Sequence, residues 1–142
     1  DRLIGGRGAD SLVGGGGNDE LVGGEGADHF RLLPANPFFG RDEIRDFVKG
    51  EDRLLIDCYQ FRLEEEPLPA ASLTTIEAWR AAPTSFAGPV FIYNQANGAL
   101  FFDEDGGTGP VSARVIVILE SRPVLDTSDF VVRDIEDPVW MF

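Results

Sequence analysis

The residues of this sequence best suited to chemistry are aspartates that close glycine-rich stretches near its start. Asp10, Asp19 and Asp28 each end a segment of the form G-G-x-G-x-D. Glycine tolerates positive φ angles, so such a segment can fold into a tight loop whose carbonyls point at one spot. The aspartate adds a carboxylate oxygen. A loop of this kind suits calcium, which takes about six to eight oxygen ligands in irregular geometry.

These loops belong to three consecutive nine-residue repeats, 5–13, 14–22 and 23–31, which fit G-G-x-G-x-D-x-U-x with U a large apolar residue. All nine glycine positions of the pattern hold Gly. A flexible linker is the alternative, but linkers do not place Asp and a bulky apolar residue at fixed offsets. The residues after each aspartate predict a three-residue strand whose middle side chain points inward. The inward side chains would stack as an apolar ladder of Leu3, Leu12, Leu21 and Phe30.

Composition narrows the possible partners. The chain has 142 residues and a formal net charge of −13, which argues against nucleic acid and against an anionic membrane surface. A hydrophobic content of 43% is enough for a folded core. No apolar run approaches the ~20 residues needed to span a bilayer. Because the sequence starts inside a repeat, with no initiator Met or signal peptide, we expect a fragment of a longer protein.

The repeats resemble the parallel β-roll of RTX, or hemolysin-type, calcium-binding proteins. In that family two repeats form one turn of the coil, and each ion lies between loops two units apart. The resemblance implies that the loops ending in Asp10 and Asp28 share one ion. The loop ending in Asp19 would face either the missing loop before Asp1 or a closing segment further on. The implied calcium ligands in the repeats are Gly5, Gly6, Arg7, Gly8, Ala9, Asp10, Gly14, Gly15, Gly16, Gly17, Asn18, Asp19, Gly23, Gly24, Gly26 and Asp28.

Residues 42–47 and 50–57 resemble the D-x-I-x-D-F…G-x-D-x-I-D signature of serralysin-type C-terminal domains. In that family this signature closes the roll, and its first aspartate completes the last calcium site. By this resemblance Asp42 is a ligand paired with the Asp19 loop, and a further ligand falls near Asn36. Asp46 fits a turn or capping residue equally well.

The rest of the chain is predicted to be β-rich. Asn97-Gly98 between the apolar runs 90–93 and 99–102 indicates a hairpin, and 112–119 is a β-branched strand. Residues 125–132 resemble the family's closing strand, and 74–82 could form one short helix. The predicted fold is all-β: a calcium-bound parallel β-roll over 1–36, N-terminally truncated, and a β-rich C-terminal cap over 37–142, packed with it as one unit.

No catalytic machinery is expected in this chain. His29 is the only histidine, so neither an H-E-x-x-H zinc site nor a Ser-His-Asp triad with a G-x-S-x-G elbow can be assembled. A pair of carboxylates, as in glycosidases, needs no motif and stays open. Asp103 and Asp105 are interpreted as a solvated turn, Glu64–Glu66 as an exposed charge run and Cys58 as a small buried hydrophobe.

The functional hypothesis is a calcium-binding C-terminal module of a secreted RTX protein, with Ca²⁺ as its cofactor, that folds on calcium after type I secretion. Residues 136–142 are acidic and then apolar, which loosely matches an uncleaved export signal read by the type I secretion apparatus. The expected location is extracellular. Two alternatives remain: an accessory module that binds polysaccharide or another surface, and the tail of a secreted protease, lipase or epimerase with its catalytic domain upstream.

Overall fold

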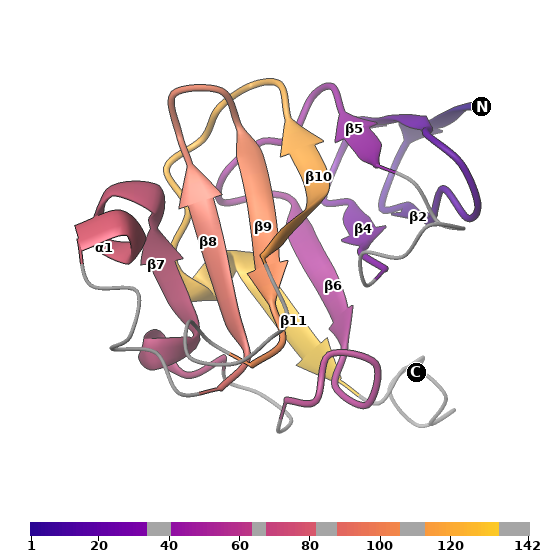
Figure 1. Cartoon of the computed structure of the whole chain (residues 1–142). Helices are drawn as coiled ribbons and strands as arrows, with labels where there is room; N and C mark the ends of the chain where they lie inside the picture. Colours follow the sequence, from indigo (N-terminus) through magenta and orange to yellow (C-terminus); the bar gives the residue numbers. More distant parts are fainter. Residues whose placement is uncertain (34–40, 64–67, 82–87, 106–112, 134–142) are drawn as a thin grey trace.

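The computed structural model describes residues 1–33, 41–63, 68–81, 88–105 and 113–133. These residues form mostly strands and one short α-helix, which confirms the predicted all-β fold (Figure 1). The strands make a seven-stranded sheet, β1-β3-β5-β10-β9-β8-β7, and a four-stranded sheet, β11-β6-β4-β2. The N-terminus lies at one end of the molecule and the helix at the other (Figure 1).

The repeats form the coil that their pattern predicts, with strands that alternate between the two sheets. β1 (Arg2–Arg7) and β3 (Glu20–Glu25) lie in the larger sheet, β2 (Ser11–Leu12) and β4 (His29–Arg31) in the smaller one. Leu3 pairs with Leu21 and Leu12 with Phe30, in parallel register. Both steps are 18 residues, so two repeats make one turn. β1 and β3 are longer than the predicted three residues because each continues through its Gly-Gly pair.

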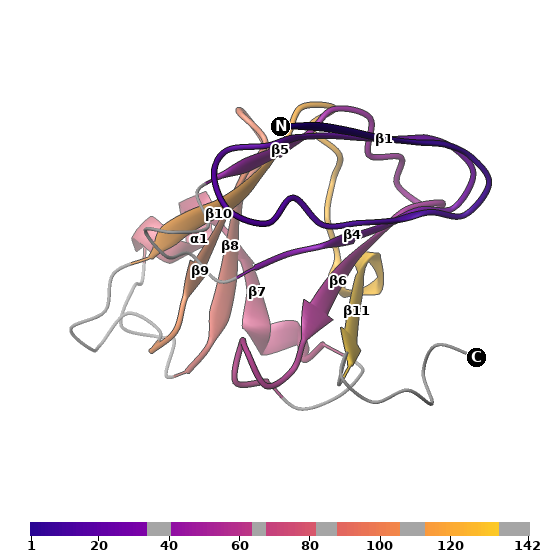
Figure 2. The same ribbon diagram turned by 90° about the vertical axis from the view of Figure 1, so that its right-hand side faces the viewer.

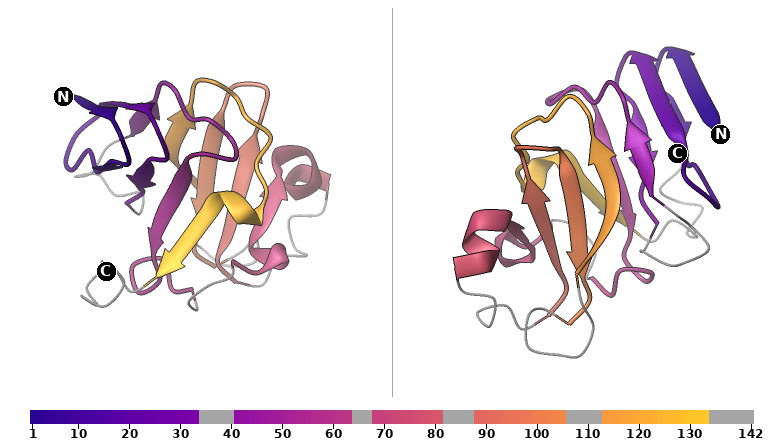
Figure 3. Two further views of the ribbon diagram at one scale, coloured as in Figure 1. Left: turned by 180° about the vertical axis from the view of Figure 1, so that it is seen from behind. Right: turned by 45° about the horizontal axis from the view of Figure 1, so that its top comes forward.

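The coil continues beyond the repeats (Figure 2). β5 (Asp42–Ile44) pairs with β3, and β6 (Arg53–Asp57) pairs with β4, both in parallel. β10 (Arg114–Leu119) then follows β5, and β11 (Phe130–Arg133) follows β6, again in parallel. Both sheets therefore run without a break from the repeats into the C-terminal half, as the view from behind in Figure 3 also shows.

The predicted ladder of inward side chains is two ladders, one on each sheet. The registers align Leu3, Leu21, Ile44 and Leu119 in one, and Leu12, Phe30, Leu54 and Phe130 in the other. All of these residues except the half-buried Leu3 are buried in one core cluster. Since each fully buried Leu or Phe contributes about 1.5–3 kcal/mol, the roll depends on a core that it shares with the cap.

The cap contains the predicted hairpin, β8 (Val90–Asn94) and β9 (Ala99–Asp103), with Gly98 at a φ of 77° in the turn. β7 (Leu73–Thr75) pairs with β8, which is why α1 (Ile76–Ala81) begins later than predicted. A short 3₁₀ helix, Ala70–Ser72, precedes β7. Aromatic rings fill the space between the sheets through contacts among Phe61, Phe91, Phe102 and Phe130.

Several finer predictions are adjusted by the structure. The predicted closing strand 125–132 is a strand only from Phe130, because Thr127–Asp129 form a 3₁₀ helix capped by Asp126. Asp103 and Asp105 form a turn, with the Asp105 amide bonded to the Asp103 carboxylate, but Asp103 is buried and not solvated. Cys58 is buried, as predicted. Residues 64–66 lie outside the described part of the chain.

Among the described helices, none is long and apolar enough to cross a membrane.

Candidate calcium-binding site

The repeat aspartates stack in two columns, one beside each ladder. In the first column the backbone nitrogen of Asp1 donates to Asp19 Oδ1 at 2.5 Å, and that of Asp19 donates to Asp42 Oδ1 at 3.0 Å. In the second, the Asp10 amide donates to Asp28 Oδ1 at 2.9 Å and the Asp28 amide to Asp52 Oδ1 at 3.0 Å. Each carboxylate that accepts one of these bonds is thus oriented by the turn of the coil before it.

In Asp19 and Asp28 these bonds engage Oδ1 and leave Oδ2 without a partner. The Oδ2 atoms of Asp10, Asp19 and Asp28 are buried and have no hydrogen-bond partner in the protein. Asp19 is 4% exposed and Asp28 is 0% exposed. Burial of an ionised oxygen without a partner is costly, so native proteins pair such groups or use them to hold a metal. Three equivalent unpaired oxygens at the ends of three glycine loops fit a bound cation.

The Asp19 loop shows this fit most clearly, because two carboxylates converge there. A Cβ built on Gly14 would lie 2.7 Å from Asp19 Oδ2 and 2.7 Å from Asp42 Oδ2. Burial raises the pKa of Asp42 to about 6; the hydrogen bond from the Asp19 backbone opposes this rise, and the charge of the Asp19 carboxylate adds to it. Two acidic oxygens that meet beside a glycine are the donor set of a hard cation such as Ca²⁺.

The loops of residues 5–10 and 23–28 are brought together, as the resemblance implied. A Cβ on Gly5 would lie 2.6 Å from Asp10 Oδ2 and 2.7 Å from the Gly23 carbonyl oxygen. One carboxylate and one carbonyl, from loops a full turn apart, therefore surround the same point. A Cβ on Gly23 would likewise contact Asp28 Oδ2 of its own loop. The first glycine of each repeat leaves room next to an unpaired carboxylate oxygen.

The remaining pattern glycines are explained by backbone conformation, and two of them also by close contact between loops. The glycines at the second and fourth positions of every repeat have positive φ angles, which disfavour any other residue: Gly6, Gly8, Gly15, Gly17, Gly24 and Gly26. A Cβ on Gly26 would lie 2.6 Å from the Gly8 carbonyl oxygen, and one on Gly24 would overlap the Gly6 carbonyl. The backbones of successive loops are in direct contact there. Side chains at Gly24 and Gly26 would force these loops apart, whereas an added Cβ at the other four positions would meet no atom within 4 Å.

The other predicted ligands vary in their placement. The Arg7 side chain is exposed, and its Nε lies 3.8 Å from Glu25 Oε2. Only the backbone of Arg7 could therefore face an ion. The Asn18 side-chain oxygen accepts a hydrogen bond from the Arg41 amide at 2.7 Å, which ties its loop to the closing segment. Asn36 lies outside the described residues. An open pocket of about 300 Å³ beside the Asp19 loop is lined by Asp1, Asn18, Asp19, Glu20, Arg41 and Glu43.

Within the described ranges, no three acidic, His or Cys side chains gather as a metal-binding group. This agrees with a site in which carboxylates meet in pairs, as those of Asp19 and Asp42 do, because backbone carbonyls would then supply most of the oxygens. Glycine-rich loops are suited to this because they can turn successive carbonyls toward one point.

Sequence reasoning missed Asp52, which ends the second column. The signal was present: Asp42-Glu43-Ile44 and Asp52-Arg53-Leu54 both repeat the D-x-U spacing of the nonapeptides. The two aspartates differ in their second oxygen, since Asp52 Oδ2 accepts a hydrogen bond from the Val48 amide at 2.8 Å. Asp42 thus offers a free oxygen to the Asp19 loop, whereas both oxygens of Asp52 are used within the protein.

Comparisons with known proteins agree with this geometry. Residues 1–30 match the family described as RTX calcium-binding nonapeptide repeat (4 copies). The solution structure of the AlgE6R3 subunit from the Azotobacter vinelandii mannuronan C5-epimerase is similar, with a TM-score of 0.52 and 26% sequence identity. The alignment covers 92% of this chain and 67% of that one. No curated protein matches the chain.

The fold and the loops define a β-roll module built on glycine-rich cation-binding turns. By the family match, residues 1–30 of this module are RTX, or hemolysin-type, calcium-binding nonapeptide repeats. Its repeats bind Ca²⁺.

Proposed function

We propose that this chain is the calcium-binding C-terminal module of a secreted RTX protein, and that it folds when calcium binds after export. The observation that carries the proposal is the meeting of Asp19 Oδ2 and Asp42 Oδ2 beside Gly14. The three glycine loops and Asp42 would hold the ions, and Asp42 would complete the site of the Asp19 loop. Bound calcium would supply positive charge beside the two Oδ2 atoms.

The same features support coupling between binding and folding. Without a cation, the unpaired oxygens of Asp10, Asp19 and Asp28 oppose the compact roll. Glycine also loses more backbone entropy on ordering than any other residue. Calcium that binds only the folded loops adds its binding free energy to folding. Extracellular modules bind calcium with Kd values of about 10⁻⁴–10⁻³ M, so the switch would operate outside the cell and not in the cytosol.

Export through a type I secretion apparatus follows from the same proposal. A chain that remains unfolded at low calcium is suited to passage through a channel, and calcium outside would then drive folding. Residues 136–142, which lie outside the described residues, have the acidic and then apolar order expected of a C-terminal export signal. The apparatus would read this end of the chain.

Any catalytic activity would reside in a domain upstream of these repeats. The single histidine, His29, is half-buried in an x position of the third repeat. The similar AlgE6R3 chain is named as a subunit of an epimerase, which supports the reading of this chain as the tail of a larger secreted enzyme. Protease and lipase tails remain alternatives of the same class.

A second candidate function is the binding of an anionic polysaccharide. Arg31, Arg53 and Arg133 each adjoin a core residue of their strand, so they lie on the outer face of the four-stranded sheet. This face carries three cations and the buried Asp57, whose Oδ2 lies 3.9 Å from Arg31 Nη2, in a chain with a net charge of −13. The name of the similar epimerase points to mannuronan as its substrate, a uronate polymer. Retention on a mannuronan matrix that is lost in an Arg31→Gln/Arg53→Gln variant would support this function.

Far-UV circular dichroism during a calcium titration, with magnesium as the control ion, tests the main proposal. We expect a largely disordered spectrum in chelator and a β-rich spectrum only with calcium. Asp19→Asn should shift the transition to higher calcium, whereas Glu51→Gln, which removes an equal charge from an exposed site, should not. A chain that is fully folded in chelator and indifferent to calcium would contradict the proposal.

A further inference from the structure

The turn between β5 and β6, residues 46–52, contacts both the third repeat loop and the C-terminal part of the chain. The roll-closing signature that residues 42–47 and 50–57 resemble covers most of this turn, but it assigns no role to the contacts of the turn with the C-terminal part of the chain. Its contacts on the two sides are made by different residues, and together they form a continuous connection from the glycine loop to β11.

On the repeat side, two carboxylates of the turn hold both ends of the loop 23–28. Asp46 Oδ1 accepts from the Gly23 amide at 2.9 Å, and Asp46 Oδ2 accepts from the Gly24 amide at 2.8 Å. Asp52 Oδ1 accepts from the Asp28 amide at 3.0 Å. These charge-assisted bonds fix the backbone at the first two residues and at the last residue of the loop. The loop shape thus depends on the turn.

An aromatic contact strengthens this side of the connection. Phe47 is 3% exposed, and its ring lies 6.2 Å from that of Phe30, between ring centroids. Phe30 is the inward residue of the third repeat and is fully buried. The turn is therefore anchored to the strand that follows the loop as well as to the loop itself.

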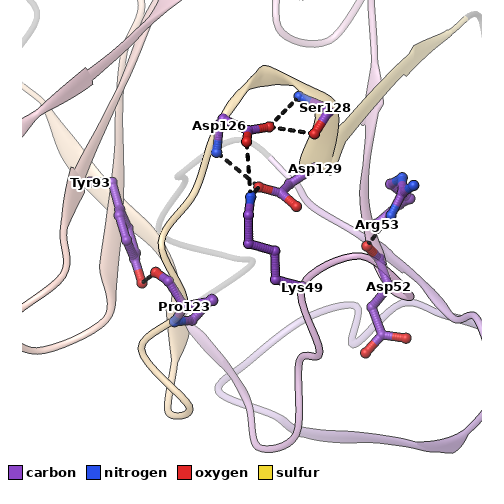
Figure 4. A network of polar contacts seen from close by, with 8 residues as sticks. All are labelled: Lys49, Asp52, Arg53, Tyr93, Pro123, Asp126, Ser128 and Asp129. Carbon is purple, nitrogen blue, oxygen red and sulfur yellow. Dashed lines mark hydrogen bonds and ion pairs between the residues drawn. The ribbon is translucent and has the colours of Figure 1, made fainter.

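On the C-terminal side, Lys49 makes the link (Figure 4). Its Nζ lies 2.7 Å from Asp129 Oδ2 and 3.0 Å from Asp126 Oδ2. Asp129 is 1% exposed and immediately precedes β11, so Lys49 neutralises a buried carboxylate at the start of this strand. The Ser121 hydroxyl also donates to the Phe47 carbonyl at 2.7 Å.

We propose that the 46–52 turn positions the third loop for calcium and couples calcium binding there to the ordering of residues 121–133. Asp46 and Asp52 are the positioning residues on the loop side, and Lys49 is the link to the C-terminal side. The inference rests on the proposed function in one respect, because it takes calcium as the ligand of the loop. If the loop orders the turn and the turn orders β11, calcium must stabilise β11, and β11 must in return raise calcium affinity.

The loop side is tested with Asp46→Asn and a matched control, Glu51→Gln, which removes an exposed charge from the same turn. Isothermal titration of the full 142-residue chain with CaCl₂ should show roughly tenfold weaker binding of one ion in Asp46→Asn, as expected for loss of a charge-assisted bond. Glu51→Gln should bind as the unmodified chain does. Equal affinity in both variants would overturn the positioning role of Asp46.

The link to β11 is tested with Lys49→Met. The control is Arg114→Met, which removes an exposed cation elsewhere in the chain. Hydrogen exchange with and without calcium is followed in two peptides, one over 20–31 and one over 126–133. In the unmodified chain and in Arg114→Met, calcium should slow exchange in both. In Lys49→Met the slowing should persist in 20–31 and fall several-fold in 126–133. Unchanged calcium protection of 126–133 in Lys49→Met would overturn the coupling.

The two tests also separate this inference from the proposed function. If the unmodified chain binds no calcium, both proposals fail. If it binds calcium and folds, but Asp46→Asn and Lys49→Met match their controls, only the role of the turn is wrong.

Discussion

The carboxylates of Asp19 and Asp42, 23 residues apart in sequence, face the same point beside Gly14. Asp42 Oδ1 accepts a hydrogen bond from the Asp19 amide at 3.0 Å, while Oδ2 of both residues lies 2.7 Å from the position a Gly14 Cβ would take. This relationship joins a glycine loop of the repeats to the segment that closes the roll. Calcium binding by the Asp19 loop should therefore respond to a side chain added at Gly14, to the loss of a carboxylate charge, and to pH.

Gly14→Ala fills the space between the two carboxylates. The new Cβ would lie well inside the contact distance to both oxygens, so either Asp19 or Asp42 must move. We expect at least tenfold weaker calcium binding, and about 1–3 kcal/mol lower stability at saturating calcium. Gly88→Ala is the control, because no atom lies within 4 Å of the added carbon. Titration calorimetry and thermal denaturation would measure both effects; a Gly14→Ala chain that binds as Gly88→Ala does would refute this geometry.

Asp42→Asn should have opposite effects with and without calcium. In chelator it removes the repulsion between the half-buried Asp42 carboxylate and the buried Asp19 carboxylate, so the folded form should gain about 1 kcal/mol after allowance for solvent screening. With calcium it removes a ligand charge, so affinity should fall about tenfold or more. Urea unfolding in chelator and in excess calcium measures the two arms. Destabilisation in both conditions would show that Asp42 acts mainly through its hydrogen bond with Asp19.

The raised pKa of Asp42 predicts a pH dependence of the calcium-free chain. The folded pKa is about 6 and the ordinary value is 3.8, so the folded state binds the proton more tightly. Any folded population in chelator should therefore be stabilised as pH falls from about 7 to about 4, with no further gain from this group below that. Calcium affinity should weaken over the same range, since the proton competes with the ion. Thermal melts at pH 7.5 and 5 would detect the change, and Asp42→Asn should abolish it.

The shared ladders predict a single unfolding unit. Leu54 is fully buried between Phe30 of the repeats and Phe130 of the cap, so Leu54→Ala should cost about 2–5 kcal/mol. Melting of the roll and of the cap should remain one transition at a lower temperature. Arg45→Met gives the contrast: Arg45 Nη1 lies 2.6 Å from Glu120 Oε1, but the pair is partly exposed, and its loss should cost less than about 1 kcal/mol. Calorimetry that resolves two transitions in Leu54→Ala would contradict the shared core.

Local repetition made much of the roll predictable. The glycines, the aspartates and the U residues recur every nine residues, and a period of this kind determines loop shape and strand facing without reference to the rest of the chain. The pairing of the loops 5–10 and 23–28 and the placement of Asp42 against Asp19 followed from the resemblance to RTX and serralysin-type domains. The hairpin at Gly98 was predictable because its turn chemistry is also local.

Features that depend on contacts between distant segments could not be predicted. After the third repeat the spacing in the aspartate columns changes from 18 residues to 23 and 24, so the period no longer identified Asp52 as the end of the second column. The same is true of Asp46 on the Gly23 and Gly24 amides, and of Lys49 beside Asp129, 80 residues away. The sequence by itself determined the calcium-loop chemistry, because each loop is built from neighbouring residues. Only the tertiary structure decided how the closed roll is joined to its cap, because that depends on which surfaces the shared core brings together.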